Sequence, residues 1–153
     1  MNNWYNKNFS IKVASNILKE TDLRGEIKQQ DDGFSYIKVN DKIVEGFYPM
    51  IPEASKPPYF GADGIGAHVS FISSEEAEEK ELAGKLKEVG KEICFKVTGL
   101  YSTNPAGWDD MKRVWFLTIE APELKDIRKG YGLPASYNGK GHKFHITVGV
   151  QKS

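Results

Sequence analysis

A chain of 153 residues, of which 39% are hydrophobic and 12% aromatic, is long enough to bury a core and too apolar to be disordered. Its 21 basic residues balance its 21 acidic ones, so no overall electrostatic field favours a nucleic-acid or membrane partner. The single cysteine, Cys94, excludes an internal disulfide framework and a cysteine metal cluster. We therefore expect one domain over residues 1–153.

The ends and composition of the chain also bear on its location. The first residues lack the apolar stretch of a signal peptide, and no apolar run approaches the roughly 18 residues of a membrane span. One unpaired cysteine suits a reducing compartment. We expect a cytoplasmic protein with no membrane partner.

In the first half of the chain, the signals are weak before residue 34 and clear after it. Residues 9–13 are compatible with a short strand and residues 14–20 with a helical turn. An Asp-Asp-Gly turn then precedes a predicted strand over 34–39, and residues 41–50 favour no single structure. A loop rich in proline and glycine over 52–66 leads to a strand over 67–72.

The second half of the chain alternates helices with strands. A pair of serines followed by four glutamates predicts a helix over 75–89, with Leu82, Ala83, Leu86 and Val89 on its buried face. The remaining predictions are strands over 93–101, 111–120 and 143–150, loops over 102–110 and 133–141, and a helix over 122–131. Mixed helices and hairpin-like strands indicate an α+β fold with antiparallel sheet.

Two of the three histidines lie in closely similar strings. His68 is followed by valine, Ser70 and phenylalanine, and His145 by isoleucine, Thr147 and valine. Because side chains alternate along a strand, each histidine shares a face with its hydroxyl residue, about 6–7 Å away, while the apolar neighbours face the core.

Two imidazoles and two hydroxyls are suited to cleaving a phosphodiester, provided that the two strands meet across a cleft. One neutral imidazole can take a proton from an attacking water or hydroxyl, while the other, as imidazolium, donates a proton to the leaving oxygen. The hydroxyls of Ser70 and Thr147 can donate to the non-bridging oxygens. This chemistry requires no metal and no cofactor, and the sequence does not distinguish the acid from the base.

At these residues the chain resembles the two-histidine (2H) phosphoesterase superfamily, which has a LigT-like, cyclic-phosphodiesterase-like fold. The order of elements from about residue 34 to residue 150 is also similar: motif, helix, strand ending near Gly99, strand, helix with Leu124 and Ile127, and second motif. The resemblance implies an α+β fold of two pseudo-symmetric lobes of antiparallel sheet, with flanking helices around a central cleft that both motif strands face.

The resemblance further implies hydrolysis or reversible opening of a cyclic or 2′,5′-linked phosphodiester. His68 and His145 would be the acid–base pair, and Ser70 and Thr147 would hold the phosphate. Some family members degrade signalling nucleotides, a role that the sequence leaves open. We expect a nucleotide or RNA phosphodiester as substrate, no obligatory protein partner, and a monomer.

Residues beside the motifs have both functional and structural readings. Tyr59 and Phe60 precede the first motif and could stack on a base, or equally well anchor their loop in the core. Lys56, Lys140 and Lys143 flank the motifs and could attract phosphate, although solvated surface lysines are more common.

Two alternative functions stay open at this point. One is a module of the same fold that binds a nucleotide or RNA end without cleaving it. The other is a metal-dependent hydrolase using His68, His142 and His145, but the odd spacing would place His142 on the opposite strand face and no carboxylate has ligand spacing. We therefore expect no metal.

Overall fold

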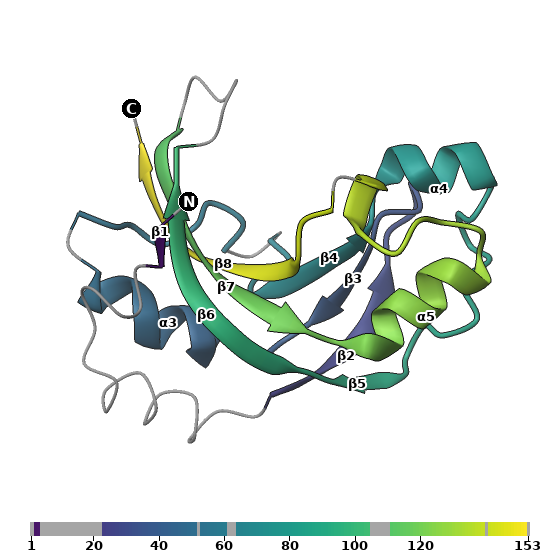
Figure 1. Cartoon of the computed structure of the whole chain (residues 1–153), viewed down its shortest axis with the longest axis horizontal. Helices are drawn as coiled ribbons and strands as arrows, with labels where there is room; N and C mark the ends of the chain where they lie inside the picture. Colours follow the sequence, from purple (N-terminus) through teal and green to yellow (C-terminus); the bar gives the residue numbers. More distant parts are fainter. Residues whose placement is uncertain are drawn as a thin grey trace.

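The structure is a computed structural model that describes residues 2–3, 23–51, 53–60, 64–104, 111–139 and 141–152. Within these ranges the strands form two antiparallel sheets of four strands each (Figure 1). The first-motif sheet has the order β4-β3-β2-β5, with β2 (Arg24–Gln29), β3 (Ser35–Lys38), β4 (His68–Ile72) and β5 (Glu92–Cys94). The second-motif sheet has the order β1-β6-β7-β8, with β1 (Asn2–Asn3), β6 (Lys96–Thr103), β7 (Met111–Glu120) and β8 (Phe144–Lys152).

Short helices flank the sheets, which confirms the predicted α+β fold. The α-helices are α3 (Lys42–Phe47), α4 (Ser74–Lys80) and α5 (Pro122–Gly130), and the 3-10 turns are η1 (Tyr48–Met50) and η2 (Tyr137–Gly139). Figure 1 shows α3 at one end of the molecule and α4 and α5 at the other. None of the helices in the described ranges is long and apolar enough to span a membrane.

The two motif strands meet at the centre of the molecule. β4 and β8 run beside each other, and each is the edge strand of its own sheet (Figure 1). Most buried side chains of both sheets and of the helices form one cluster, which includes Ile37, Val69 and Phe71 from one sheet and Leu117, Ile146 and Val148 from the other. A shared core therefore fixes the two motif strands relative to each other.

The predicted strand over 93–101 is in fact two strands in different sheets. β5 pairs with β2, whereas β6 pairs with β7. The chain crosses between the sheets at Phe95, whose amide donates to the carbonyl of Leu23 at 3.0 Å. The predicted loop over 102–110 begins inside β6, and its residues 105–110 lie outside the described ranges.

The helix after the first motif is shorter than the predicted 75–89. It begins with a capping box at Ser73 and ends where Glu81 adopts the left-handed conformation, with φ 55° and ψ 47°. The amide of Leu82 then donates to the carbonyl of Ala77 at 2.8 Å, as in a Schellman cap.

The side chain of Gln29 explains why the helix does not continue. Its amide nitrogen donates to the carbonyl of Leu82 at 3.0 Å, and its amide oxygen accepts from Gly84 N–H at 3.0 Å. These backbone groups are thereby satisfied without a helix. Leu82 and Leu86 are buried as predicted, but Ala83 is exposed and Val89 is 52% exposed.

The sequence did not predict β2 or α3, both of which contribute to the core. β2 alternates exposed and buried residues and places Ile27 in the core. Its exposed positions are mostly charged and its first buried position is Gly25, so the sequence shows little apolar alternation. α3 is a short helix that buries Ile43, Val44 and Phe47. The weak predictions over 9–13 and 14–20 lie outside the described residues.

A fully buried arginine connects the end of the first motif strand with the loop before the second motif strand. The guanidinium of Arg128 donates to both carboxylate oxygens of Glu76, at 2.8 and 2.6 Å. It also donates to the carbonyls of Phe71 at 2.6 Å, Pro134 at 2.7 Å and Ser136 at 2.6 Å. Arg128 therefore joins α5, the end of β4, α4 and the loop before β8.

Replacing Arg128 by methionine should destabilise the fold by about 3–5 kcal/mol, because the carboxylate of Glu76 is left buried without its counter-ion. Urea unfolding measures the loss. Lys129→Met, at the neighbouring exposed position, is the matched control and should change stability by less than about 0.5 kcal/mol. Equal stability of the two variants would contradict the role given to Arg128.

Candidate active site

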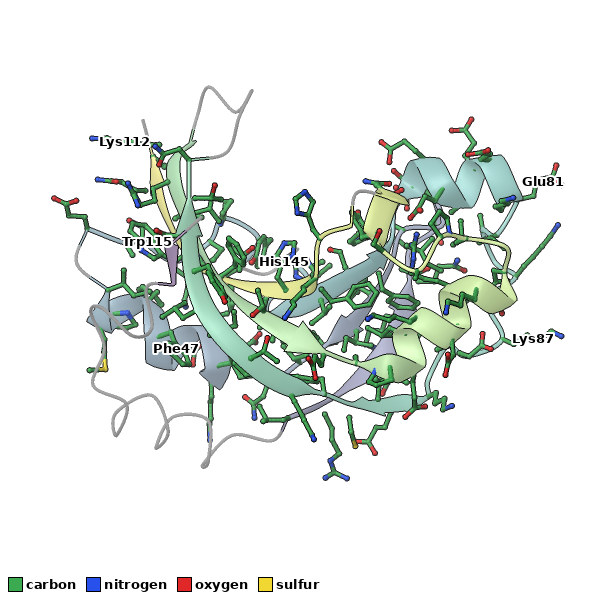
Figure 2. The ribbon with its side chains drawn as sticks, in the orientation of Figure 1. Phe47, Glu81, Lys87, Lys112, Trp115 and His145 are labelled. Carbon is green, nitrogen blue, oxygen red and sulfur yellow. The ribbon has the colours of Figure 1, made fainter. Side chains whose placement is uncertain are left out.

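The motif strands alternate as the sequence predicts. His68, Ser70 and Thr147 are half-buried and His145 is exposed, whereas the residues between them are buried. We call the faces of β4 and β8 that carry these four side chains, one in each sheet, the motif face. Figure 2 shows His145 on β8 near the centre of the molecule.

The ring of His68 is oriented by the backbone just before it. Its Nδ1 lies 2.7 Å from the carbonyl oxygen of Gly66, and because a carbonyl only accepts, Nδ1 carries the proton. Gly66 has a φ of +70°, and a Cβ there would lie 2.6 Å from Oδ1 of Asp41. Glycine is therefore required at the position whose carbonyl fixes the imidazole.

His145 has the same arrangement in a looser form. Its Nδ1 faces the carbonyl oxygen of Lys143 at 3.4 Å, again two residues earlier in the chain. In both motifs the Nδ1 position is turned toward the chain's own backbone. Nε2 is thus the nitrogen left to exchange a proton with a substrate.

Tyr59 spans the two motifs. Its ring packs edge-on against His68, with ring centroids 4.7 Å apart, and its hydroxyl donates to the carbonyl of Thr147 at 3.1 Å. Burial raises the pKa of Tyr59 above its ordinary value, so the phenol keeps its proton as a donor. Phe60 stacks on the same ring at 5.6 Å. Tyr59 therefore links the first motif to the second strand.

The pKa of each motif histidine is lowered. For His68 burial is the main cause, and the positive charges of Lys38 and His145 add to it against the hydrogen bond with Gly66. For His145, desolvation by the surrounding protein is likewise the main cause, and the charge of His142 adds to it against the hydrogen bond with Lys143. Neutral imidazoles are favoured, and a proton on His145 disfavours one on His68.

Lys38 was not predicted as part of the site. It is the cross-strand neighbour of His68, and its ammonium is held by Asp41 at 2.5 Å and by the carbonyls of Val39 at 2.9 Å and Ala67 at 3.1 Å. Asp41 also accepts from the amide of Ala67 at 2.9 Å. Lys38 therefore supplies a fixed positive charge beside His68, and its donors are occupied by protein.

The hydroxyl residues each face an aromatic neighbour across the strand pair. Ser70 pairs with Tyr36 on β3, and Thr147 pairs with Phe116 on β7. In the described part of the chain, neither hydroxyl makes a hydrogen bond. Both are thus available as donors to a bound group.

Of the three predicted lysines, the structure describes Lys56 and Lys143. Lys56 lies over the rings of Tyr48 and Phe60, at 5.8 and 5.0 Å, and pairs with Glu45 at 3.8 Å. Lys143 is exposed. Lys140 lies outside the described residues.

Lys143 lines a hollow of about 330 Å³ beside α5 and the start of β8. Phe144 and Ile119 also line it, and both belong to the buried face opposite His145. Among the described residues, no three His, Cys, Asp or Glu side chains gather as metal ligands do.

The residues that sequence reasoning missed are Lys38, Tyr36 and Phe116. Each is a cross-strand neighbour of a motif residue or lies next to one. The alternation of Tyr36 and Lys38 along β3 was visible in the sequence, but only the pairing of β3 with β4 makes it part of the site.

Comparison with known families identifies the family of the chain. A family model described as "Swiss Army Knife, 2H phosphoesterase domain" matches residues 35–153, which include both motifs. No curated protein and no solved structure matches the chain.

Lys38→Met should raise the pKa of His68, because a positive charge beside the ring is removed. NMR titration of the imidazole C–H resonances measures the change, and Lys85→Met, at an exposed position beyond α4, is the control. A higher pKa keeps His68 protonated at higher pH, so any activity that needs a neutral His68 should be lost earlier on acidification. An unchanged titration curve would contradict the assigned charge effect.

Proposed function

Since the chain belongs to the 2H phosphoesterase family and is a phosphoesterase at that level, we propose that it hydrolyses a phosphodiester of a nucleotide or RNA without a metal ion. A cyclic phosphate or a 2′-linked diester is the proposed bond. His68 and His145 are the proposed acid–base pair, and Ser70 and Thr147 the proposed phosphate donors.

The matched presentation of the two imidazoles is the observation that carries the proposal. Each ring turns Nδ1 toward the carbonyl two residues before it, at 2.7 Å for His68 and 3.4 Å for His145. The rings stand on adjacent strands of different sheets, and Tyr59 contacts both strands. Two outward Nε2 atoms from separate lobes suit a reaction that both takes and gives a proton.

In the proposed reaction, one Nε2 accepts a proton from the attacking water or hydroxyl as its oxygen bonds to phosphorus. The bond between phosphorus and the leaving oxygen breaks, and the other imidazolium donates its proton to that oxygen. Burial lowers the pKa of both histidines, and each has a further positive charge nearby, Lys38 for His68 and His142 for His145, so either imidazole can serve as the base while the other serves as the acid.

The two hydroxyls would hold the phosphate during this exchange. Negative charge grows on the non-bridging oxygens, and the hydroxyls of Ser70 and Thr147 share the motif face with the imidazoles. Of the two readings that the sequence left open for Tyr59, we propose the structural one: its hydroxyl donates to the carbonyl of Thr147, and it acts as a positioning residue. We likewise give Lys143 no role in binding the phosphate.

His68→Ala and His145→Ala should each reduce turnover by about 10²-fold or more. The assay is a panel of 2′,3′-cyclic mononucleotides, cyclic dinucleotides, 2′,5′-linked oligonucleotides and RNA with cyclic phosphate ends, with products identified by mass in the presence of EDTA. His142→Ala, exposed and outside the motif, is the control and should retain activity.

Three results would argue against the proposal. Full activity in either motif variant would remove the mechanism. Activity that EDTA abolishes would indicate a metal-dependent hydrolase, and tight binding without turnover would indicate a binding module.

Ser70→Ala and Thr147→Val should each lower kcat by roughly 10- to 10³-fold, because a donor to the charged phosphate oxygens is lost. Valine keeps the shape of threonine, so melting temperature should change little for Thr147→Val. Thr103→Val, near the end of β6, provides the matched control. Unaltered kcat in both motif variants would show that the hydroxyls do not act on the phosphate.

A further inference from the structure

Each motif hydroxyl has an aromatic ring as its partner in the neighbouring strand. Ser70 on β4 pairs with Tyr36 on β3, and Thr147 on β8 pairs with Phe116 on β7. Cross-strand partners project to the same side of a sheet. Both rings therefore lie on the motif face, one in each sheet.

Each of these rings stacks on a second aromatic ring. Phe34 and Tyr36 have centroids 5.5 Å apart and planes inclined by 23°. Tyr101 and Phe116 have centroids 6.2 Å apart and planes inclined by 24°. The two sheets thus carry equivalent stacked pairs, which we call the first and second aromatic pairs.

Each aromatic pair also adjoins the histidine of its own motif. Tyr36 and Phe34 meet the ring of His68 edge-on, at 5.7 and 6.3 Å. Phe116 meets the ring of His145 at 5.3 Å with planes inclined by 62°. Each pair is therefore next to both chemical groups of a motif.

Core packing does not account for all of this aromatic surface. The core on the other side of the second-motif sheet is filled by residues of opposite parity, such as Leu100 and Leu117. Tyr36 is buried, and Phe116 packs against the buried side chains of Val114 and Val150. Phe34, Tyr101 and Phe116 nevertheless stay half-buried on the motif face, so each pair keeps at least one accessible ring. Apolar rings beside polar catalytic groups offer flat faces on which a nucleobase can stack.

We propose that the two aromatic pairs are nucleobase platforms on either side of the scissile phosphate, so that the substrate is a phosphodiester joining two nucleosides. This inference rests on the proposed function and narrows it. A cyclic phosphate on a single nucleoside presents one base and leaves the other platform without a partner. Because stacking reads the π-face, the platforms should tolerate different bases.

The first test compares substrates with the wild-type protein. The probes are 2′,5′-linked and 3′,5′-linked adenylyl-adenosine, the same diesters with either adenine replaced by hydrogen, and 2′,3′-cyclic AMP. Removing either base should lower kcat/KM by about tenfold. The 2′,3′-cyclic AMP should be cleaved no better than the one-base diesters.

The second test assigns each base to a platform. Phe34→Leu and Tyr101→Leu remove the outer ring of each pair and keep an apolar side chain, so each should lower kcat/KM on the better two-base diester by about tenfold. For each variant, the loss in kcat/KM should disappear on the one-base diester that lacks the base stacked on the altered aromatic pair. Tyr131→Leu is the control. It changes a half-buried aromatic residue that directly follows α5 and contacts Lys87 and Glu88, and it should leave the ratios of kcat/KM among the diesters unchanged.

The outcomes separate this inference from the proposed function. Equal cleavage of one-base and two-base diesters, or faster cleavage of 2′,3′-cyclic AMP, would overturn the platforms and leave the two-histidine mechanism standing. Failure to cleave any probe or any member of the wider panel would overturn both. Because the first test uses only the wild type, misfolding of a variant cannot obscure the result.

Discussion

The buried guanidinium of Arg128 is the interaction on which the placement of the site depends. It holds the carbonyl of Phe71 at the end of the first motif strand and the carbonyls of Pro134 and Ser136 in the loop that leads to the second. Its ion pair with Glu76 also fixes α4, which begins directly after the first motif strand. One side chain thus sets the ends of two segments that come from distant parts of the chain.

An ion pair this deep does little for stability by itself, because removing both charges from water costs about as much as their attraction returns. Glu76 stays charged nonetheless. Burial works to raise its pKa, but the hydrogen bonds from Arg128 and from the amide of Ser73 outweigh that effect and lower it. The planar fork of Arg128 binds Glu76 through two nitrogens and also reaches three carbonyls, so it fixes α4, the end of β4 and the loop before β8 relative to one another.

The sequence was sufficient to predict the structural features that depend on a residue pattern within a single segment. Both motif strands, the helix over α5 and the α+β fold follow from local patterns, and the structure agrees with them. The early end of α4 could not be predicted, because it depends on the side chain of Gln29, which reaches Leu82 from 53 residues away. The split between β5 and β6 likewise depends on which sheet each segment joins.

The same distinction applies within the site. The strand period places His68 with Ser70 and His145 with Thr147, and no further information is needed for that. Tyr59, Lys38 and the aromatic pairs enter through contacts between segments far apart in the chain, such as the bond from Tyr59 to a carbonyl 88 residues away. A short repeated string therefore identifies the chemistry of the reacting bond. The proposed aromatic platforms depend instead on the register between strands, and they become visible only when β3 is seen beside β4 and β7 beside β8.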